Sequence, residues 1–322
     1  MDLRSPGSPP FHLVARVHYN LAGSATDGTY EMLWLAPDRW REDIKMDGVG
    51  SETEIAQGDK IVSLRSSSGP ILPLASIRGV LLPERKKAYT WDLKMKKIHL
   101  MPVDGEQRVC IDSKQGPALK ETACLDRTAA EVSVLRDLEF LESMERSDFV
   151  FVGDKRYPRH IATHFFDETM DIHVELLAVP QEGIESALAA PEGAVVRDWC
   201  PKEEIKESVG GPASPVFMMR PPGAVIRYYV LVDTNGRVKE WAPLRKETKT
   251  IDALLATPDY LRSVQSSGSG APILLQGKYL GSMDKTMAAW FPEARLAKRS
   301  CGGKPIEYEY VMQAPVAIPR SN

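Results

Sequence analysis

Residues 28–48, GTYEMLWLAPDRWREDIKMDG, show the alternation of two extended runs joined by a turn. The turn falls at Ala36-Pro37-Asp38, because proline cannot donate a hydrogen bond to a central β-ladder. One face of the second run carries Trp40, Glu42, Ile44 and Met46. The other face of this run is charged. A period of two with one apolar face predicts a β-sheet that is exposed to water on one side only.

The same alternation recurs before and after this stretch. Residues 11–20 predict a half-buried strand, and late strands follow, in which Ile172, Val174 and Leu176 share one face. Between them, residues 72–85 have apolar residues at helical spacing. We therefore expect a meander of antiparallel strands whose apolar face is covered by one amphipathic helix.

The composition divides the chain into two predicted domains. Residues 11–179 form an antiparallel half-barrel, and residues 180–223, rich in Pro, Gly and charge, form a linker. Residues 224–315 form a small α+β domain that opens with a hairpin at Asn235-Gly236, the strongest short hairpin signal. The predicted fold class of the whole chain is α+β.

Charge and hydropathy restrict the partners and the compartment. With 41 Lys and Arg against 44 Asp and Glu, the net charge of −3 favours no nucleic-acid partner. No apolar run reaches the ~18 to 20 residues that span a bilayer. The first strand begins at Phe11 with almost no lead, so we expect that an export leader or an earlier segment precedes this version of the chain.

The four cysteines are informative by position. Cys110 and Cys124 bracket a turn-rich loop, and a bridge between them predicts a stabilisation of about 3 kcal/mol. A second bridge, from Cys200 to Cys301, would extend this prediction. Sequence alone does not determine the pairing, so four free thiols are the alternative. No C-x-x-C motif is present, so disulfides in an oxidising compartment are favoured over zinc.

No catalytic constellation is recognisable in the sequence. The chain has no G-x-S-x-G, no Walker loop and no G-x-G-x-x-G after a strand. Ser282 and Lys285 match S-x-x-K by chance, since the companion motifs are missing. His160 and His164 are interpreted as surface or core histidines, and residues 167–171 as a solvated turn. We expect a non-enzymatic protein with no cofactor and no metal.

Two parts of residues 11–179 stand out: TYEMLWLAPDRWREDI at residues 29–44 and DFVFVGDKRYPRHIATHFFDETMDIHVELL at residues 148–177. Together they resemble the lipoprotein-carrier fold typified by LolA. The resemblance implies an open antiparallel half-barrel around helices, with a concave apolar face that holds acyl chains. The implied ligand-binding residues are Leu13, Val17, Trp34, Trp40, Ile44, Ile172, Val174 and Leu176. A shift of one residue in the strand register would move these side chains to the other face.

The end of the chain combines the hairpin at Asn235-Gly236 with Trp290-Phe291-Pro292, Ala294 and Gly303-Lys304-Pro305. This pattern is similar to the C-terminal domain of TonB-type energy transducers. The stretch 258–281 interrupts the helix that is usual in that family. The resemblance implies a terminal strand that is available for strand addition to an envelope protein.

These observations predict a periplasmic, non-enzymatic protein of the bacterial cell envelope. Its first domain would bind a lipid or an acyl-bearing ligand, and its second domain a protein partner. Two alternatives remain. The first is a degenerate hydrolase-like enzyme that binds its substrate in a trough formed by the concave apolar face. The second is a structural interaction module in which the helices of the chain already cover the apolar faces of both sheets. The enzyme would need clustered titratable groups in the trough, where the inward faces offer Glu42 as a charge.

Overall fold

The computed structural model describes residues 3–4, 8–21, 24–66, 72–82, 97–103, 105–115, 119–125, 132–137, 142–152, 155–165, 168–181, 184–200, 205–207, 225–243 and 288–315. The chain forms two compact units. Unit 1 comprises Met1–Ser51 and Pro73–Ala189, and unit 2 comprises Glu52–Leu72 and Ala190–Asn322. Each unit is built around antiparallel strands. None of the helices in the described ranges has the length and apolarity that crossing a bilayer requires.

Unit 1 contains a long antiparallel sheet in the order β3-β2-β1-β12-β11-β10-β9-β8-β7-β6. Its first part consists of β1 (Phe11–Leu21), β2 (Ser24–Ala36) and β3 (Arg39–Met46), joined as the proline turn predicts. The remaining strands are β6 (Lys97–Val103), β7 (Glu106–Gln115), β8 (Leu119–Leu125), β9 (Val132–Asp137), β10 (Glu142–Val152), β11 (Lys155–Phe165) and β12 (Glu168–Ala178). The pairing of β1 with β12 joins the first and the last strand of the predicted first domain in the interior of the sheet.

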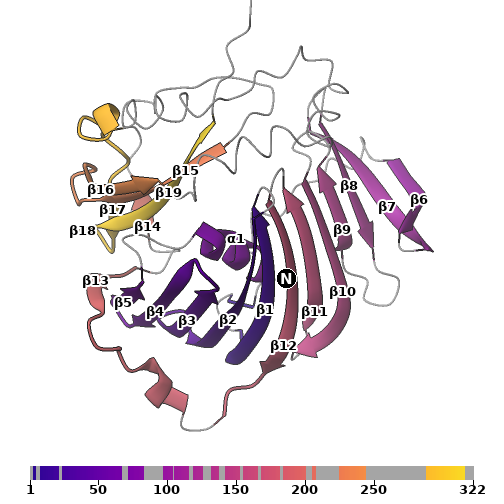
Figure 1. The fold of residues 1–322 in the computed structure, drawn as a ribbon, viewed down its shortest axis with the longest axis horizontal. Helices are drawn as coiled ribbons and strands as arrows, with labels where there is room; N and C mark the ends of the chain where they lie inside the picture. Colours follow the sequence, from indigo (N-terminus) through magenta and orange to yellow (C-terminus); the bar gives the residue numbers. More distant parts are fainter. Residues whose placement is uncertain are drawn as a thin grey trace, which may run out of the picture. The chain divides into compact units, whose positions relative to one another are not determined.

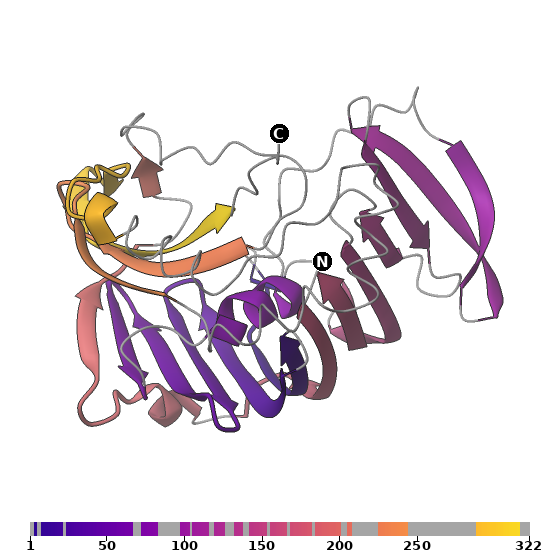
Figure 2. The ribbon, with the colours of Figure 1, turned by 45° about the horizontal axis from the view of Figure 1, so that its top comes forward.

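The predicted covering helix is confirmed as α1 (Leu72–Leu81), which lies within the curve of the unit 1 sheet (Figure 1; Figure 2). A short 3₁₀ helix, η2 (Ile184–Leu188), follows the last strand. Strands outnumber helices in the described ranges, so this part of the fold is mostly β and contains less helix than the α+β class predicted from the sequence. Short apolar runs of the kind seen here do not distinguish strand from helix by periodicity alone.

Unit 2 contains three small groups of strands. The first is β13-β5-β4, with β4 (Gly50–Gln57), β5 (Lys60–Arg65) and β13 (Val195–Asp198). The second is β14-β17-β18, with β14 (Ile205–Glu207), β17 (Arg299–Cys301) and β18 (Lys304–Ile306). The third is β16-β15-β19, with β15 (Val225–Val232), β16 (Val238–Pro243) and β19 (Tyr308–Pro315).

A buried ionic cluster connects strand β5 to strand β19 within unit 2. The Arg65 guanidinium binds Glu309 through both Nη atoms, at 2.8 and 2.6 Å, and donates from Nε to Glu52 at 2.6 Å. Its Nη2 also reaches Glu54 at 3.1 Å. The Tyr229 hydroxyl donates to Glu309 at 3.0 Å. Because only 10% of the Arg65 side chain and 1% of the Glu52 side chain are exposed, these charges depend on one another for solvation.

The hairpin predicted at Asn235-Gly236 is confirmed between β15 and β16. The Asp233 carboxylate accepts from the backbone N–H groups of Asn235 and Arg237, each at 2.8 Å. Gly236 has φ +79°, and its carbonyl accepts from the Leu296 N–H at 2.8 Å. The turn therefore anchors the segment that leads into β17.

Replacing Gly236 with alanine should lower the free energy of unfolding by about 2–4 kcal/mol. A Cβ there would lie 2.4 Å from the carbonyl oxygen of Leu296, a backbone atom that cannot rotate away, at a φ that L-residues avoid. Gly302→Ala is the matched control, because its φ is +54° and nothing lies within 4 Å of the added carbon. Urea denaturation should show a loss of about 1 kcal/mol for the control, and an equal loss for both variants would contradict the steric argument.

Candidate functional site

The concave side of the unit 1 sheet is a continuous apolar face across five strands. Cross-strand register places alternate residues of β1 beside those of β2 and β12, as in the pairs Ala15 with Tyr30 and Val17 with Ile172. We call the following buried residues the apolar face: Phe11, Leu13, Ala15, Val17, Tyr19, Tyr30, Met32, Trp34, Ile44, Met46, Tyr157, Ile161, Met170, Ile172 and Val174. The alternation read from the sequence thus corresponds to one physical surface.

Helix α1 covers this face with its own apolar side chains. Leu74, Ile77 and Leu81 are 0–3% exposed, at the spacing that puts them on one side of the helix. The Tyr157 hydroxyl donates to the carbonyl oxygen of Leu81 at 2.5 Å, which satisfies an acceptor at the helix end. The helix is therefore fixed to β11 at its C-terminus.

The second attachment of α1 is a polar contact with β3. Arg78 donates from Nε to Glu42 Oε1 at 3.0 Å, and its Nη2 contacts the other carboxylate oxygen. The Tyr30 hydroxyl also donates to Glu42, at 2.5 Å. Burial, together with the neighbouring Glu42 carboxylate, raises the pKa of Tyr30 well above its ordinary value. The phenol therefore remains a hydrogen-bond donor to Glu42 throughout the physiological range.

Most of the residues predicted to bind the ligand come together on the apolar face. Six of them are at most 5% exposed in the presence of α1: Leu13, Val17, Trp34, Ile44, Ile172 and Val174. Trp40 pairs with Trp34 across β2 and β3 and is half-buried. The Trp34 ring also stacks on Phe11, with centroids 6.3 Å apart. Solvent therefore already reaches this face at Trp40.

The structure places Leu176 elsewhere, contrary to the expected shared face with Ile172 and Val174. A bulge between Val14 and Ala15 shifts the pairing of β1 with β12, so Leu176 lies opposite Val14 on the convex side and is 40% exposed. A bulge adds one residue to one strand and reverses the side on which later residues fall. The sequence carries no local signal of this shift.

Glu168 and Asp171 also differ from the solvated turn that the sequence suggested. Glu168 begins β12 and is buried at 3% exposure, while Asp171 is a strand residue beside His160 and His173. His160 and His173 lie directly opposite each other, because β11 pairs with β12 in this register.

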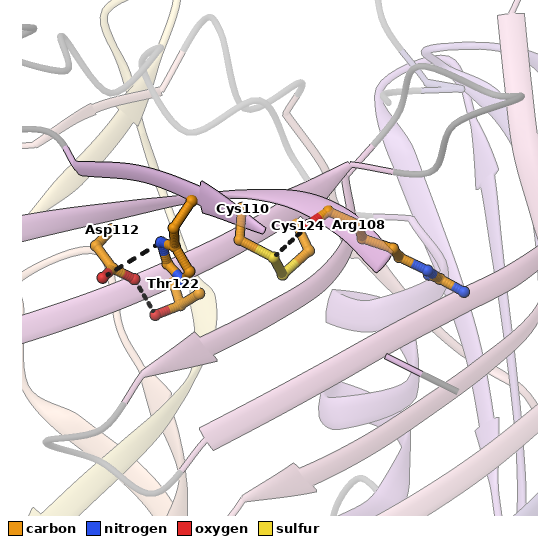
Figure 3. The surroundings of a disulfide bond; sticks show 6 residues. Arg108, Cys110, Asp112, Thr122 and Cys124 are labelled. Atoms are coloured by element: carbon orange, nitrogen blue, oxygen red, sulfur yellow. Dashed lines mark hydrogen bonds and ion pairs between the residues drawn. A yellow bond between two sulfur atoms is a disulfide. The ribbon is translucent and has the colours of Figure 1, made fainter. Parts of the chain in front are cut away.

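Both cysteine pairs form disulfides. Cys110 and Cys124 are directly opposed on β7 and β8 (Figure 3). Both are fully buried and form a small apolar cluster with Val103. Beside them, the Thr122 hydroxyl donates to Asp112 at 2.7 Å. Cys200 is joined to Cys301, which connects the segment after β13 to β17 within unit 2. Disulfides of this kind persist in oxidising compartments.

No protein-family model matches the sequence, and no curated protein matches it. Distant similarity exists to solved structures. An outer membrane lipoprotein-sorting protein domain from Vibrio parahaemolyticus is 10% identical, covering 57% of this chain and 93% of its own, with a TM-score of 0.30. A LolA superfamily protein from Nitrosomonas europaea is 8% identical, covering 56% and 90%, with a TM-score of 0.34.

A MucA/MucB complex structure from Pseudomonas aeruginosa is also similar, with 15% identity, coverage of 70% of this chain and 76% of that chain, and a TM-score of 0.26. Because these three TM-scores lie below 0.5, the ligand of this chain has to be inferred from its own geometry.

Proposed function

We propose that the protein is a non-enzymatic cell-envelope protein whose unit 1 binds a lipid or another acyl-bearing ligand on the apolar face. The observation that carries this proposal is the apolar face itself, which spans five strands and, among the residues that the structure describes, is covered by one helix of ten residues. Trp40 marks the place where a ligand would first make contact. An acyl chain is the ligand class that such a face accommodates without new polar contacts.

Binding of the ligand would displace α1 from the apolar face. The side chains of Leu74, Ile77 and Leu81 are buried, and an acyl chain would take their place as the helix moves outward. Burying about 300 Å² of ligand and wall favours binding by ~7 kcal/mol at roughly 25 cal/mol per Å². Helix displacement and association offset several kcal/mol of this, so we expect weak to moderate affinity.

The buried carboxylate Glu42 supports a binding role rather than catalysis. It is fully engaged by the Tyr30 hydroxyl and the Arg78 guanidinium, an arrangement that positions α1. Its removal from water would be costly without these donors. In the proposed function Glu42 therefore holds α1 against β3 through its ion pair with Arg78.

Two further observations support the envelope setting and a protein partner. The disulfides Cys110–Cys124 and Cys200–Cys301 fit an exported, periplasmic chain. In the part of unit 2 that the structure describes, β19 pairs with β15 and ends the order β16-β15-β19. A strand at the end of a sheet has unpaired backbone groups, so we propose this edge of the TonB-C-like segment for strand addition to an envelope protein.

A lipophilic fluorescent probe tests the binding role. N-phenyl-1-naphthylamine should gain fluorescence saturably when titrated with the full chain. Trp40→Asp should weaken its binding at least ~10-fold, because a charge at the open end of the apolar face forfeits more than about 1.4 kcal/mol. The half-buried position of Trp40 makes this variant less disruptive to folding than a change at Leu13.

Leu176→Asp is the matched control on the same sheet. Leu176 is exposed on the convex side, so its variant should bind the probe within ~2-fold of the wild type. Far-UV circular dichroism should show that both variants are folded. Absence of a saturable gain in the folded wild type would favour the structural module, in which α1 closes the apolar face permanently.

A further inference from the structure

The convex side of unit 1 carries a compact group of imidazole and carboxylate side chains on β11 and β12. His160 and His173 are directly opposed in the register of these strands, and their neighbours Ile161 and Ile172 point to the apolar face. Because side chains alternate along a strand, both histidines lie on the opposite, solvent-facing side. This group is separate from the proposed ligand-binding face.

The imidazoles of His160 and His173 both contact one carboxylate oxygen of Asp171. Nε2 of His160 and Nε2 of His173 each lie 3.0 Å from Oδ1 of Asp171. The two imidazole rings stack with centroids 4.4 Å apart and planes inclined by 13°. The side chains are 35% exposed for His160, 47% for Asp171 and 63% for His173, so none of the three is buried.

We propose that His160, Asp171 and His173 form a binding site for a divalent first-row transition metal ion such as Zn²⁺. Their donor atoms lie within 4.8 Å of one another. Ligands around a tetrahedral zinc ion, with bonds of about 2.0–2.1 Å, lie ~3.3 Å apart, so only small side-chain movements are needed. Two imidazoles and one carboxylate are donors that suit such ions, and three protein ligands leave a position for water.

The surroundings of His160 support coordination through Nε2. Its other ring nitrogen, Nδ1, lies 3.1 Å from the Ser147 hydroxyl on β10. When Nε2 binds a metal ion, the ring proton resides on Nδ1, where Ser147 can accept it. Metal-binding histidines commonly make such a hydrogen bond, which orients the ring and fixes its tautomer.

The cationic residue that faces His173 across β1 and β12 is paired with a carboxylate. Arg16, which pairs with His173 in register, is bound through Nε to Glu175 at 2.5 Å, and this ion pair neutralises it. All four cysteines are in disulfides, so thiolates do not compete for the ion. The site therefore differs from the sulfur-based zinc sites that the sequence excluded.

Isothermal titration of the untagged full chain with ZnCl₂ tests the proposal, since a histidine tag would itself bind zinc. The wild type should bind one ion per chain. His160→Ala and His173→Ala should each weaken binding at least ~100-fold, and Ser147→Ala about 10-fold, as expected for a group that only orients a ligand. With Co²⁺ in place of Zn²⁺, the visible absorption should be that of nitrogen and oxygen ligands without a thiolate band.

His164→Ala is the matched control, because His164 is an exposed histidine on the same strand and the same side of β11. It should leave the affinity and the stoichiometry unchanged. Far-UV circular dichroism identifies any variant that fails to fold, and Asp171→Asn then serves as a substitute that preserves side-chain shape. The proposal is overturned if the wild type binds no zinc, or if the folded His160→Ala and His173→Ala variants bind it as tightly as the wild type.

Discussion

Replacing Arg65 with methionine is expected to lower the free energy of unfolding of unit 2 by about 3–5 kcal/mol. The methionine would remove the guanidinium that satisfies Glu52, Glu54 and Glu309, and would leave their carboxylates without this cation in a largely dry environment. Removing one partner of a buried ionic group costs more than the pair contributes, because the remaining charge stays desolvated. Urea denaturation of the full chain, followed by tryptophan fluorescence, measures the change.

Lys60→Met is the matched control on the same strand. Lys60 pairs with Asp198 at the surface, and its removal should leave the denaturation midpoint unchanged. The free energy of unfolding of Arg65→Lys should lie between those of Arg65→Met and Lys60→Met. The lysine ammonium keeps the charge but lacks the planar guanidinium that binds Glu309 through two nitrogens. A loss below about 1 kcal/mol for Arg65→Met would show that the cluster contributes little.

The same cluster should make the wild type sensitive to acid. Burial tends to raise the pKa of Glu309, but the hydrogen bond and charge of Arg65, the charge of Arg197 and the hydrogen bond from Tyr229 outweigh this and lower it. A carboxyl group with a lowered folded-state pKa stabilises the protein above its unfolded pKa, about 4.3, and this stability is lost as pH falls through the folded value. The Arg65→Met variant should therefore lose less stability than the wild type between pH ~5 and ~3.

Removing the Cys200–Cys301 disulfide by double alanine substitution should lower the free energy of unfolding by about 4–5 kcal/mol. The bridge closes a loop with a sequence separation of 101 residues, which restricts the unfolded chain strongly. Thermal and urea denaturation of the variant under non-reducing conditions provide the test. The expected loss lies entirely within unit 2.

The Cys110–Cys124 double alanine variant is the internal comparison. Its loop has a sequence separation of 14 residues, for which the chain-entropy account predicts a loss of about 3 kcal/mol. The difference of ~1.8 kcal/mol depends on loop length and on no particular contact. A larger loss for the shorter loop would indicate that packing around Cys110 and Cys124, which are fully buried, dominates over chain entropy.

Local patterns were sufficient for two turns and for the helix. Proline at position 37 ends β2, the Asn235-Gly236 dipeptide turns the hairpin, and the spacing of Leu74, Ile77 and Leu81 predicts α1. In each case the decisive interaction lies within a few residues, so it is encoded where it acts. The helix ends at Leu81 rather than at residue 85, and helix ends are the least determined part of such a pattern.

The sequence by itself determined which side of each strand is apolar, because a period of two assigns alternate residues to opposite faces as soon as a strand exists. Only the tertiary structure decided the register in which neighbouring strands pair and which distant strands meet. The bulge beside Val14 moved Leu176 to the convex side, the pairing of β11 with β12 placed His160 beside His173, and strand β19 brought Glu309 to Arg65. These contacts join residues 13 to 244 positions apart, and their register depends on the summed packing of whole strands, which no local pattern records.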